Sequence, residues 1–192
     1  MHLSPNLVLA TLVFLPTVAM AVVVTSTSDP TVRAEPAKPL TATANLVNLQ
    51  GKSIGTATLT QVQDGVNVAI AARSLPKNTT LAWHIHQTGT CDLKGKFASA
   101  GSHFNPLEKS HGFEHAEGHH AGDLPNLQIG DDGVIATSVT TPNISLMKGV
   151  NTSVFDKDGS AIVIHTKADD YKSQPAGDAG DRLACGVIKA SN

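Results

Sequence analysis

Histidines concentrate in one part of this 192-residue sequence, and their density points to metal binding. Seven of the nine histidines fall within the forty residues 84–123. An unpaired imidazole gives a fold little that a simpler side chain would not, whereas neutral imidazole nitrogens are common metal ligands. The sequence therefore predicts a metal centre in this stretch, and the rest of the chain should serve to position it.

The first group of candidate ligands starts from the motif His84-Ile85-His86. On a β-strand, side chains two residues apart point to the same face, so the two imidazoles should project together while Trp83 and Ile85 face a core. His165 ends the apolar run 161–164 and fits the same group, although alone it would be a residue at the rim of a sheet. A structural role for the pair remains the alternative.

The second group combines three imidazoles with one carboxylate. This set matches the preferences of a closed, four-coordinate zinc site, and the short His-x-x-Asp step lets one tight turn supply two ligands. Its members are His103, His111, His120 and Asp123.

The elements that must hold these ligands are short runs that alternate between apolar and polar residues. Turn sequences such as Gln63-Asp64-Gly65 and Asp131-Asp132-Gly133 separate them,. With no convincing amphipathic helix, about eight such runs predict an all-β antiparallel sandwich or barrel. The predicted strands are 42–49, 54–62, 66–73, 81–87, 126–129, 134–141, 161–166 and 183–189.

Two long insertions interrupt the strands, at 88–127 and at 167–182. Loops of this length are uncommon in a compact domain unless they are functional. Both carry the polar residues that the strands lack, so we expect them to form the site.

The N-terminal residues predict export. Residues 7–24 are largely apolar and include the small-x-small triplet Ala19-Met20-Ala21, which is typical of a signal peptide cleaved after Ala21,. The stretch before it has no Lys or Arg, and an uncleaved membrane anchor is the alternative. Residues 22–40 have the composition of a flexible linker, which leaves 41–192 as one folded domain.

Charge and motif content exclude a nucleic-acid partner. The net charge is −2 and no basic run occurs, whereas phosphate neutralisation needs clustered Lys and Arg. A phosphate-binding loop at Gly51-Lys52-Ser53 is excluded because Leu46 stands where that motif requires glycine,.

Two cysteines, Cys91 and Cys185, remain in the folded part. Export leads to an oxidising compartment, so we expect them to form a disulfide, with two buried free thiols as the alternative.

Together these motifs resemble, in order, the signatures of the copper/zinc superoxide dismutases over about residues 41–192. The secretory start and the segment 87–91 resemble the exported bacterial branch of that family. The motifs are His84-Ile85-His86, Ala100-Gly101-Ser102-His103-Phe104-Asn105-Pro106, His111-Gly112, His120-Ala121-Gly122-Asp123-Leu124, His165-Thr166-Lys167-Ala168-Asp169-Asp170-Tyr171 and the run from Gly180 to Ile188.

The resemblance implies an eight-stranded antiparallel Greek-key β-barrel, flattened like an immunoglobulin sandwich, with two functional loops and one copper and one zinc per subunit. It implies His103 as an imidazolate shared by both metals, Asp169 as a carboxylate linking the two sites, and a disulfide between Cys91 and Cys185. Copper is then expected on His84, His86, His103 and His165, and zinc on His103, His111, His120 and Asp123.

The implied activity is dismutation of superoxide to dioxygen and hydrogen peroxide by Cu(II)/Cu(I) cycling, which protects the periplasm or another exported compartment. Arg182 is expected beside the open copper position to bind the anion, with weaker steering by Lys167, Lys94 or Lys96,. The partner is superoxide itself. The sequence leaves the oligomeric state open, a homodimer included, and membrane contact is expected only if the N-terminal segment is retained.

Some residues depart from the family pattern, and other functions are open. Ala176 stands where many members have threonine, which predicts a wider and less polar wall of the copper channel. His115 and His119 match no ligand role, so they are surface histidines or a metal-recruiting patch. A copper or zinc storage or delivery protein on the same barrel is the alternative function. A two-metal zinc hydrolase is disfavoured because it needs a general base, and only Asp169 and Asp170 are expected nearby.

Overall fold

The computed structural model describes residues 38–191, and the regular structure in this part consists of β-strands. One 3-10 turn, η1 (Ala98–Ala100), is the only helical element in this part. The predicted signal peptide 1–21 and residues 22–37 of the predicted linker lie outside it. The strands are β1 (Thr41–Asn48), β2 (Ser53–Val62), β3 (Gly65–Ala72), β4 (Thr79–Leu81), β5 (Trp83–His86), β6 (Leu127–Ile129), β7 (Ile135–Thr141), β8 (Ala161–His165), β9 (Arg182–Val187) and β10 (Lys189–Ala190).

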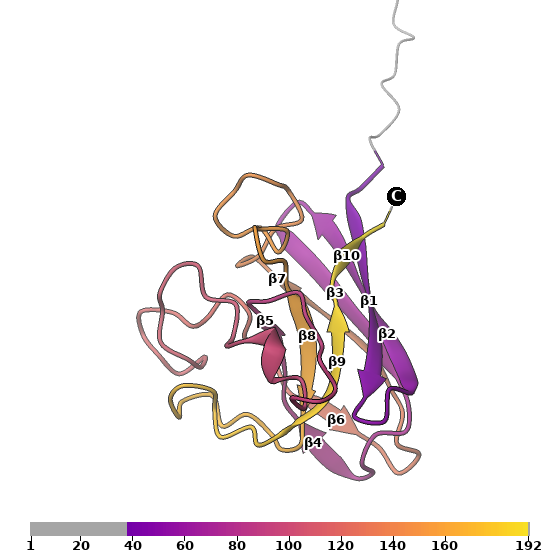
Figure 1. Cartoon of the computed structure of the whole chain (residues 1–192). Helices are drawn as coiled ribbons and strands as arrows, with labels where there is room; N and C mark the ends of the chain where they lie inside the picture. Colours follow the sequence, from indigo (N-terminus) through magenta and orange to yellow (C-terminus); the bar gives the residue numbers. More distant parts are fainter. Residues whose placement is uncertain (1–37, 192) are drawn as a thin grey trace, which may run out of the picture. The chain divides into compact units, whose positions relative to one another are not determined.

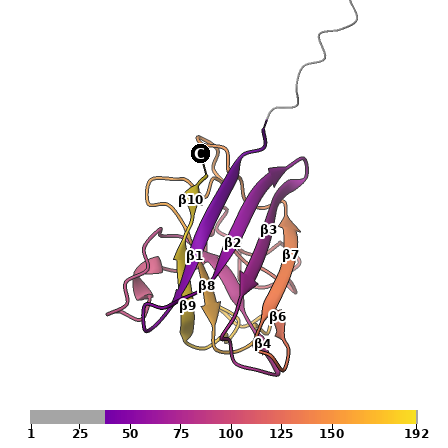
Figure 2. The same ribbon diagram turned by 90° about the vertical axis from the view of Figure 1, so that its right-hand side faces the viewer.

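The strands form a curled antiparallel sheet with Greek-key connections, which confirms the predicted barrel (Figure 1). The order is β5-β8-β9-β1-β2-β3-β7, with β10 also paired to β1. Because β4 leads into β5 and β6 leads into β7, the separate β4-β6 pair connects the two edge strands. Figure 2 shows the β1-β2-β3-β7 half of the sheet from its outer side.

Each predicted run contains a strand, but two runs are divided. The run 81–87 breaks at Ala82, whose N–H donates to Lys167 O (2.7 Å) and whose carbonyl accepts from His165 N (2.8 Å). The chain passes there from a pairing with β6 to a pairing with β8. The run 183–189 breaks at Ile188, whose N–H donates to Ser160 O (2.9 Å).

The main core lies between the two halves of the sheet. Alternate residues of the strands point inward, as in β3, where Val66, Val68 and Ile70 are buried. Trp83 is one of the few aromatic residues in this core, and its indole N–H donates to Pro125 O (2.7 Å). Burial of mostly aliphatic side chains therefore supplies the rigid support for β5 and β8.

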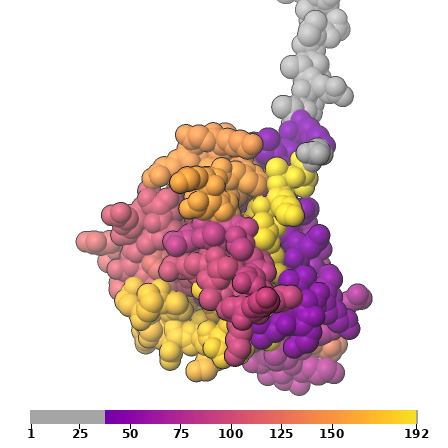
Figure 3. All heavy atoms as spheres, viewed as in Figure 1, coloured from indigo at the N-terminus to yellow at the C-terminus, as the bar shows by residue number. Residues whose placement is uncertain are grey.

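A second, smaller core attaches the first loop to the outer side of β8 and β9. Phe97 and Ala100 from the loop pack with Ala161, Val163 and Cys185 from the strands. Cys91 and Cys185 form the predicted disulfide, with 5.7 Å between their Cα atoms. In the space-filling view, the two loops pack side by side over this face of the sheet (Figure 3).

Residues 38–191 contain no helix of the length and apolarity needed to cross a membrane.

The disulfide should stabilise the metal-free domain. It joins residues 94 positions apart, and cross-linking a loop of that length lowers the entropy of the unfolded chain. The double variant Cys91→Ser/Cys185→Ser should lose about 4–5 kcal/mol of unfolding free energy. Urea unfolding of the metal-free proteins measures this difference, and an unchanged midpoint would contradict it.

Candidate metal centre

Strand geometry brings three histidines to one face of the sheet. On β5, His84 and His86 point away from the main core, while Trp83 and Ile85 point into it. In the antiparallel pairing with β8, His84 lies opposite Val163 and His86 opposite Ala161. His165, two residues beyond Val163, therefore projects on the same face as the β5 pair.

A β-bulge sets the position of Arg182. The register of β8 and β9 shifts between Ile164 and His165, so that His165 pairs with Arg182 while Ile164 pairs with Ala184. A bulge of this kind redirects the side chains that follow it. Arg182 therefore lies beside the histidine face instead of one residue further along the strand.

The first loop returns along the free edge of β5 and brings His103 and Asp123 to it. Gln87 N donates to Ser102 O (2.9 Å), Phe104 N to Ile85 O (2.8 Å) and Ile85 N to Gly122 O (2.9 Å). These bonds place His103 opposite His86 and Asp123 opposite His84.

This return depends on a glycine. A Cβ at Gly122 would lie 2.2 Å from Ile85 O, so no other residue fits there without moving the backbone. Because of this glycine and the pairing with the edge of β5, His103 and Asp123 are held in place by backbone hydrogen bonds as strand residues are, although they belong to a loop.

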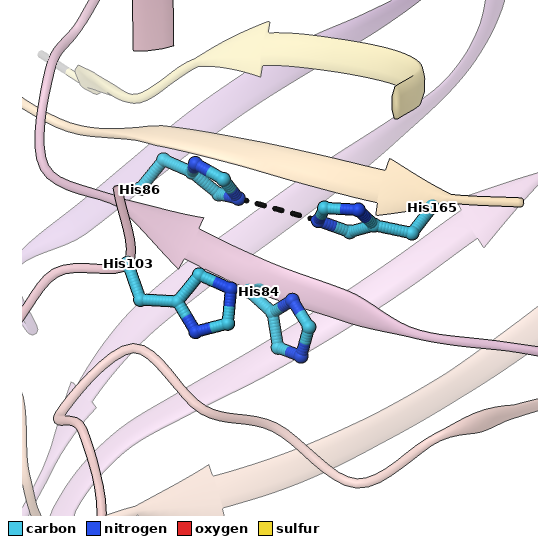
Figure 4. Close-up of side chains that lie close together, drawn as sticks. All are labelled: His84, His86, His103 and His165. Carbon is cyan, nitrogen blue, oxygen red and sulfur yellow. Dashed lines mark hydrogen bonds between the residues drawn. The ribbon is translucent and has the colours of Figure 1, made fainter. Parts of the chain in front are cut away.

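The first donor set consists of four buried imidazoles that face one another (Figure 4). Each offers one ring nitrogen, and all four nitrogens lie within 4.8 Å of one another. The set is His84, His86, His103 and His165.

The tautomers of His86 and His165 leave lone pairs pointing at each other. His86 Nδ1 donates to Gly101 O (2.8 Å), and His165 Nδ1 faces Gly180 O (3.4 Å). Their Nε2 atoms are then both acceptors, yet they lie 3.3 Å apart, the contact dashed in Figure 4. A cation bound to both nitrogens satisfies this pair.

Two further nitrogens of this set are buried without any partner. They are His84 Nδ1 and His103 Nε2. Buried polar atoms in native proteins are almost always paired, so such orphans need an explanation. A metal ion bound by four imidazoles supplies one, and the donor chemistry suits copper.

The second donor set has the dimensions of a tetrahedral site. His103 Nδ1 and His111 Nδ1 lie 2.8 and 3.1 Å from Asp123 Oδ1, and His120 Nδ1 lies 3.3 Å from His103 Nδ1 and 3.4 Å from Asp123 Oδ1. Ligands at about 2.0 Å from a tetrahedral ion are separated by about 3.3 Å. Three imidazoles and one carboxylate at these separations fit zinc.

His103 belongs to both sets. Its Nδ1 lies in the second set and its Nε2 in the first. A neutral imidazole has one lone pair, so ligation through both nitrogens requires the imidazolate. The geometry therefore supports a bridge between two ions.

Asp169 connects the two sets from outside. Its Oδ2 accepts from His84 Nε2 (2.8 Å) and its Oδ1 from His111 Nε2 (2.9 Å). Partners of this kind fix the tautomer and orientation of ligating histidines.

Asn126 holds Asp169 in turn, and sequence reasoning missed it. The Asn126 Nδ2 atom donates to Asp169 O (2.9 Å), and Oδ1 accepts from Asp169 N (2.8 Å). Asn126 follows Asp123 by three residues, but nothing in the sequence pattern distinguishes it from a turn asparagine.

Burial keeps the first set neutral. Desolvation lowers the pKa of His103 to about 4 and that of His165 to about 3. It also lowers the pKa of His84, and it holds the pKa of His86 well below the usual value. Their lone pairs are therefore available to a metal at neutral pH.

Two members of the second set, Asp123 and His111, are charged in the absence of metal. Burial by itself raises the pKa of Asp123, but hydrogen bonds from His103, His111 and His120 outweigh it and hold this pKa far below its usual range. Burial likewise opposes protonation of His111, yet hydrogen bonds to Asp123 and Asp169 raise its pKa to about 9.

Arg182 is fixed by the first loop. Its guanidinium, half-buried, donates to the carbonyls of Phe97 and Gly101. Its pairing with His165 across β8 and β9 places it beside the first set. Besides burial, its charge contributes to the lowered pKa values of His86 and His165. Lys94, Lys96 and Lys167 are exposed, and their steering role stays a prediction.

His115 and His119 belong to neither donor set. His119 Nδ1 donates to His120 O (2.7 Å), and its ring packs against Phe113 with centroids 4.3 Å apart. His115 Nε2 lies 3.0 Å from Gln174 Nε2. Ala176 is half-buried, and its effect on the copper channel stays a prediction.

Comparison with known proteins identifies the family. The family model described as copper/zinc superoxide dismutase matches residues 53–188. The chain belongs to the copper/zinc superoxide dismutase family. A copper/zinc superoxide dismutase of Aquifex aeolicus is 48% identical over 153 residues, covering 80% of this chain and 90% of that protein.

Solved structures of the family agree with the fold. A superoxide dismutase-like protein of Bacillus subtilis is 43% identical in its crystal structure, with a TM-score of 0.73 over 77% of this chain and 97% of that one. The enzyme from Brucella abortus aligns with a TM-score of 0.63 at 25% identity, covering 78% of this chain and 99% of that chain. Copper and zinc are therefore the metals of this superoxide dismutase family member.

Zinc uptake should release a proton. With a pKa of about 9, His111 is protonated in the metal-free protein at pH 7, and an ion bound at Nδ1 must displace that proton. We expect about one proton released per zinc at pH 7 and progressively fewer as the pH rises past 9. Titration calorimetry in buffers of different ionisation enthalpy measures the number; a pH-independent value of zero would refute the assignment.

Proposed function

We propose that this protein catalyses the dismutation of superoxide to dioxygen and hydrogen peroxide, with copper in the first donor set and zinc in the second. The observation that carries the proposal is the orientation of His103, which presents one nitrogen to each set. A shared imidazolate couples the two sites chemically, which simple storage of metal would not require.

The two ions have different tasks. Bound copper supplies one-electron oxidation and reduction, while zinc has no redox chemistry and supplies fixed charge and geometry. Over a full cycle, two superoxide anions and two protons give one dioxygen and one hydrogen peroxide.

His103 is suited to handle a proton in this cycle. Its Nδ1 lies in the second donor set, where zinc would hold it, while its Nε2 is buried and has no protein partner. When Nε2 is not ligating, it can hold a proton at the atom that faces the substrate side. Asp169 keeps His84 and His111 fixed meanwhile, so that Nε2 returns to the same position.

Arg182 is the proposed binding group for the anion. Two of its N–H groups are used by loop carbonyls, and a guanidinium has five donors in total. Because these two carbonyls already hold the guanidinium in place, its remaining donors can orient a small anion without the entropy cost of ordering a free side chain.

The compartment is part of the proposal. An exported, periplasmic location is supported by the apolar segment 7–24 and by a disulfide, which persists in oxidising compartments,.

The test is superoxide decay measured by pulse radiolysis with purified protein loaded with both metals. We expect a second-order rate near the diffusional range, about 10⁸–10⁹ M⁻¹s⁻¹. Tight binding of both metals with decay no faster than buffer alone would leave a storage or delivery role.

Replacement of Arg182 separates substrate binding from metal binding. Arg182→Ala should slow turnover roughly tenfold or more, because an anion loses its positive guide, while both metals remain bound. Arg182→Lys should recover part of the rate because it keeps the charge. Metal content by mass spectrometry is the control, and loss of copper in Arg182→Ala would show that the residue supports the site instead.

A further inference from the structure

Gln174, in the second loop, bonds to the backbone of His111, in the first. Its Oε1 accepts from His111 N (2.9 Å) and its Nε2 donates to His111 O (3.0 Å). The two residues are 63 positions apart in the chain. Because both backbone polar groups are engaged, the contact fixes the position and the rotation of His111, as pairing with a neighbouring strand would.

The backbone of His111 matters because its ring has no freedom of its own. The side chain is fully buried, with Nδ1 3.1 Å from Asp123 Oδ1 and Nε2 2.9 Å from Asp169 Oδ1. A shift of the backbone would therefore move the ring out of both contacts. Site geometry must be held within about 0.5 Å to keep its function.

The segment 171–177 encloses His111 closely. A Cβ at Gly112, where φ is +97°, would lie 1.9 Å from Tyr171 O. A Cβ at Gly177 would lie 1.8 Å from Asp169 Oδ1 and 2.5 Å from His111 Nε2. These glycines allow the second loop to touch the ligand directly, which leaves little room for the ring to move while the loop is in place.

Gln174 itself is exposed, and further contacts set the orientation of its amide. Nε2 also lies 3.1 Å from Lys172 O and 3.0 Å from His115 Nε2. Acceptors on that side make Nε2 the donor toward His111 O, which fixes the amide assignment. The same contact gives His115 a role as an acceptor for the amide, without any metal.

We propose that Gln174 is a positioning residue that latches the second loop onto His111 and thereby slows the exchange of zinc. The proposal rests on the zinc assignment of the second donor set. Gln174 is exposed and its two bonds to His111 are only partly buried, so breaking them has a modest cost, and the latch can open for metal loading and close again afterwards. Release of the ion then depends on how often the segment 171–177 lifts from His111.

The experiment replaces the amide while keeping its shape. In Gln174→Met, both hydrogen bonds are lost and the length of the side chain is kept. We expect zinc to leave the fully loaded protein about ten- to a hundredfold faster, the usual effect of removing an outer partner of a metal ligand. Transfer of zinc to a chromophoric chelator measures the rate without reference to dismutase activity. Gln50→Met, at an exposed turn glutamine, is the matched control and should leave the rate unchanged.

A conservative variant and a spectrum distinguish positioning from general stability. Gln174→Glu keeps an acceptor for His111 N and loses the donor to His111 O, so its release rate should fall between wild type and Gln174→Met. Cobalt in place of zinc should show altered d–d bands in Gln174→Met, while the unfolding midpoint of the metal-free protein stays that of wild type.

The outcomes are separable. Equal zinc release in wild type and Gln174→Met would overturn the latch, and so would faster release accompanied by a lower unfolding midpoint of the metal-free variant. A wild-type protein that takes up no zinc would instead overturn the proposed site itself.

Discussion

The position of one imidazole, that of His103, is the constraint on which the rest of the structure depends. Its two nitrogens belong to two different donor sets, so its ring must be placed precisely although it comes from a loop. The backbone bonds between residues 102–104 and residues 85–87 provide this placement, because they pair the loop with the edge of β5 through an isolated bridge. The disulfide and the small core around Phe97 hold the same loop at its beginning.

The two loops are joined by two pairs of hydrogen bonds beside the site. Asn126 of the first loop bonds to both backbone groups of Asp169, and Gln174 of the second bonds to both backbone groups of His111. Asp169 and His111 are themselves joined by a 2.9 Å hydrogen bond. A change in either loop should therefore be felt in the other, and through Asp169 at His84 of the first donor set.

The sequence predicts the parts of this structure that follow from periodicity. Alternation along the strands predicts the core, and the spacing of His84 and His86 predicts a shared face. The membership of both donor sets comes from the family resemblance and from the preferences of zinc. Other features could not be predicted, because each depends on residues far apart in the chain. They are the bulge that pairs His165 with Arg182, the break at Ala82, and the side-chain amide contacts of Asn126 and Gln174 with backbone groups. An exposed glutamine such as Gln174 carries no periodic signal at all.

The outer partners of the imidazoles explain why the proton exchange proposed here falls to His103. His84 and His111 each give one nitrogen to Asp169, His86 gives one to Gly101 O, and His165 faces Gly180 O. Each of these rings is thus fixed by one nitrogen and has a single nitrogen left for a metal. His103 has no such outer contact: one nitrogen faces Asp123 and the other is buried without a partner. It can therefore exchange a metal for a proton at Nε2 and become a neutral imidazole while Nδ1 still holds the ring. A proton at the free nitrogen of His84, His86 or His165 would instead make that ring a cation, which its burial disfavours by lowering the pKa.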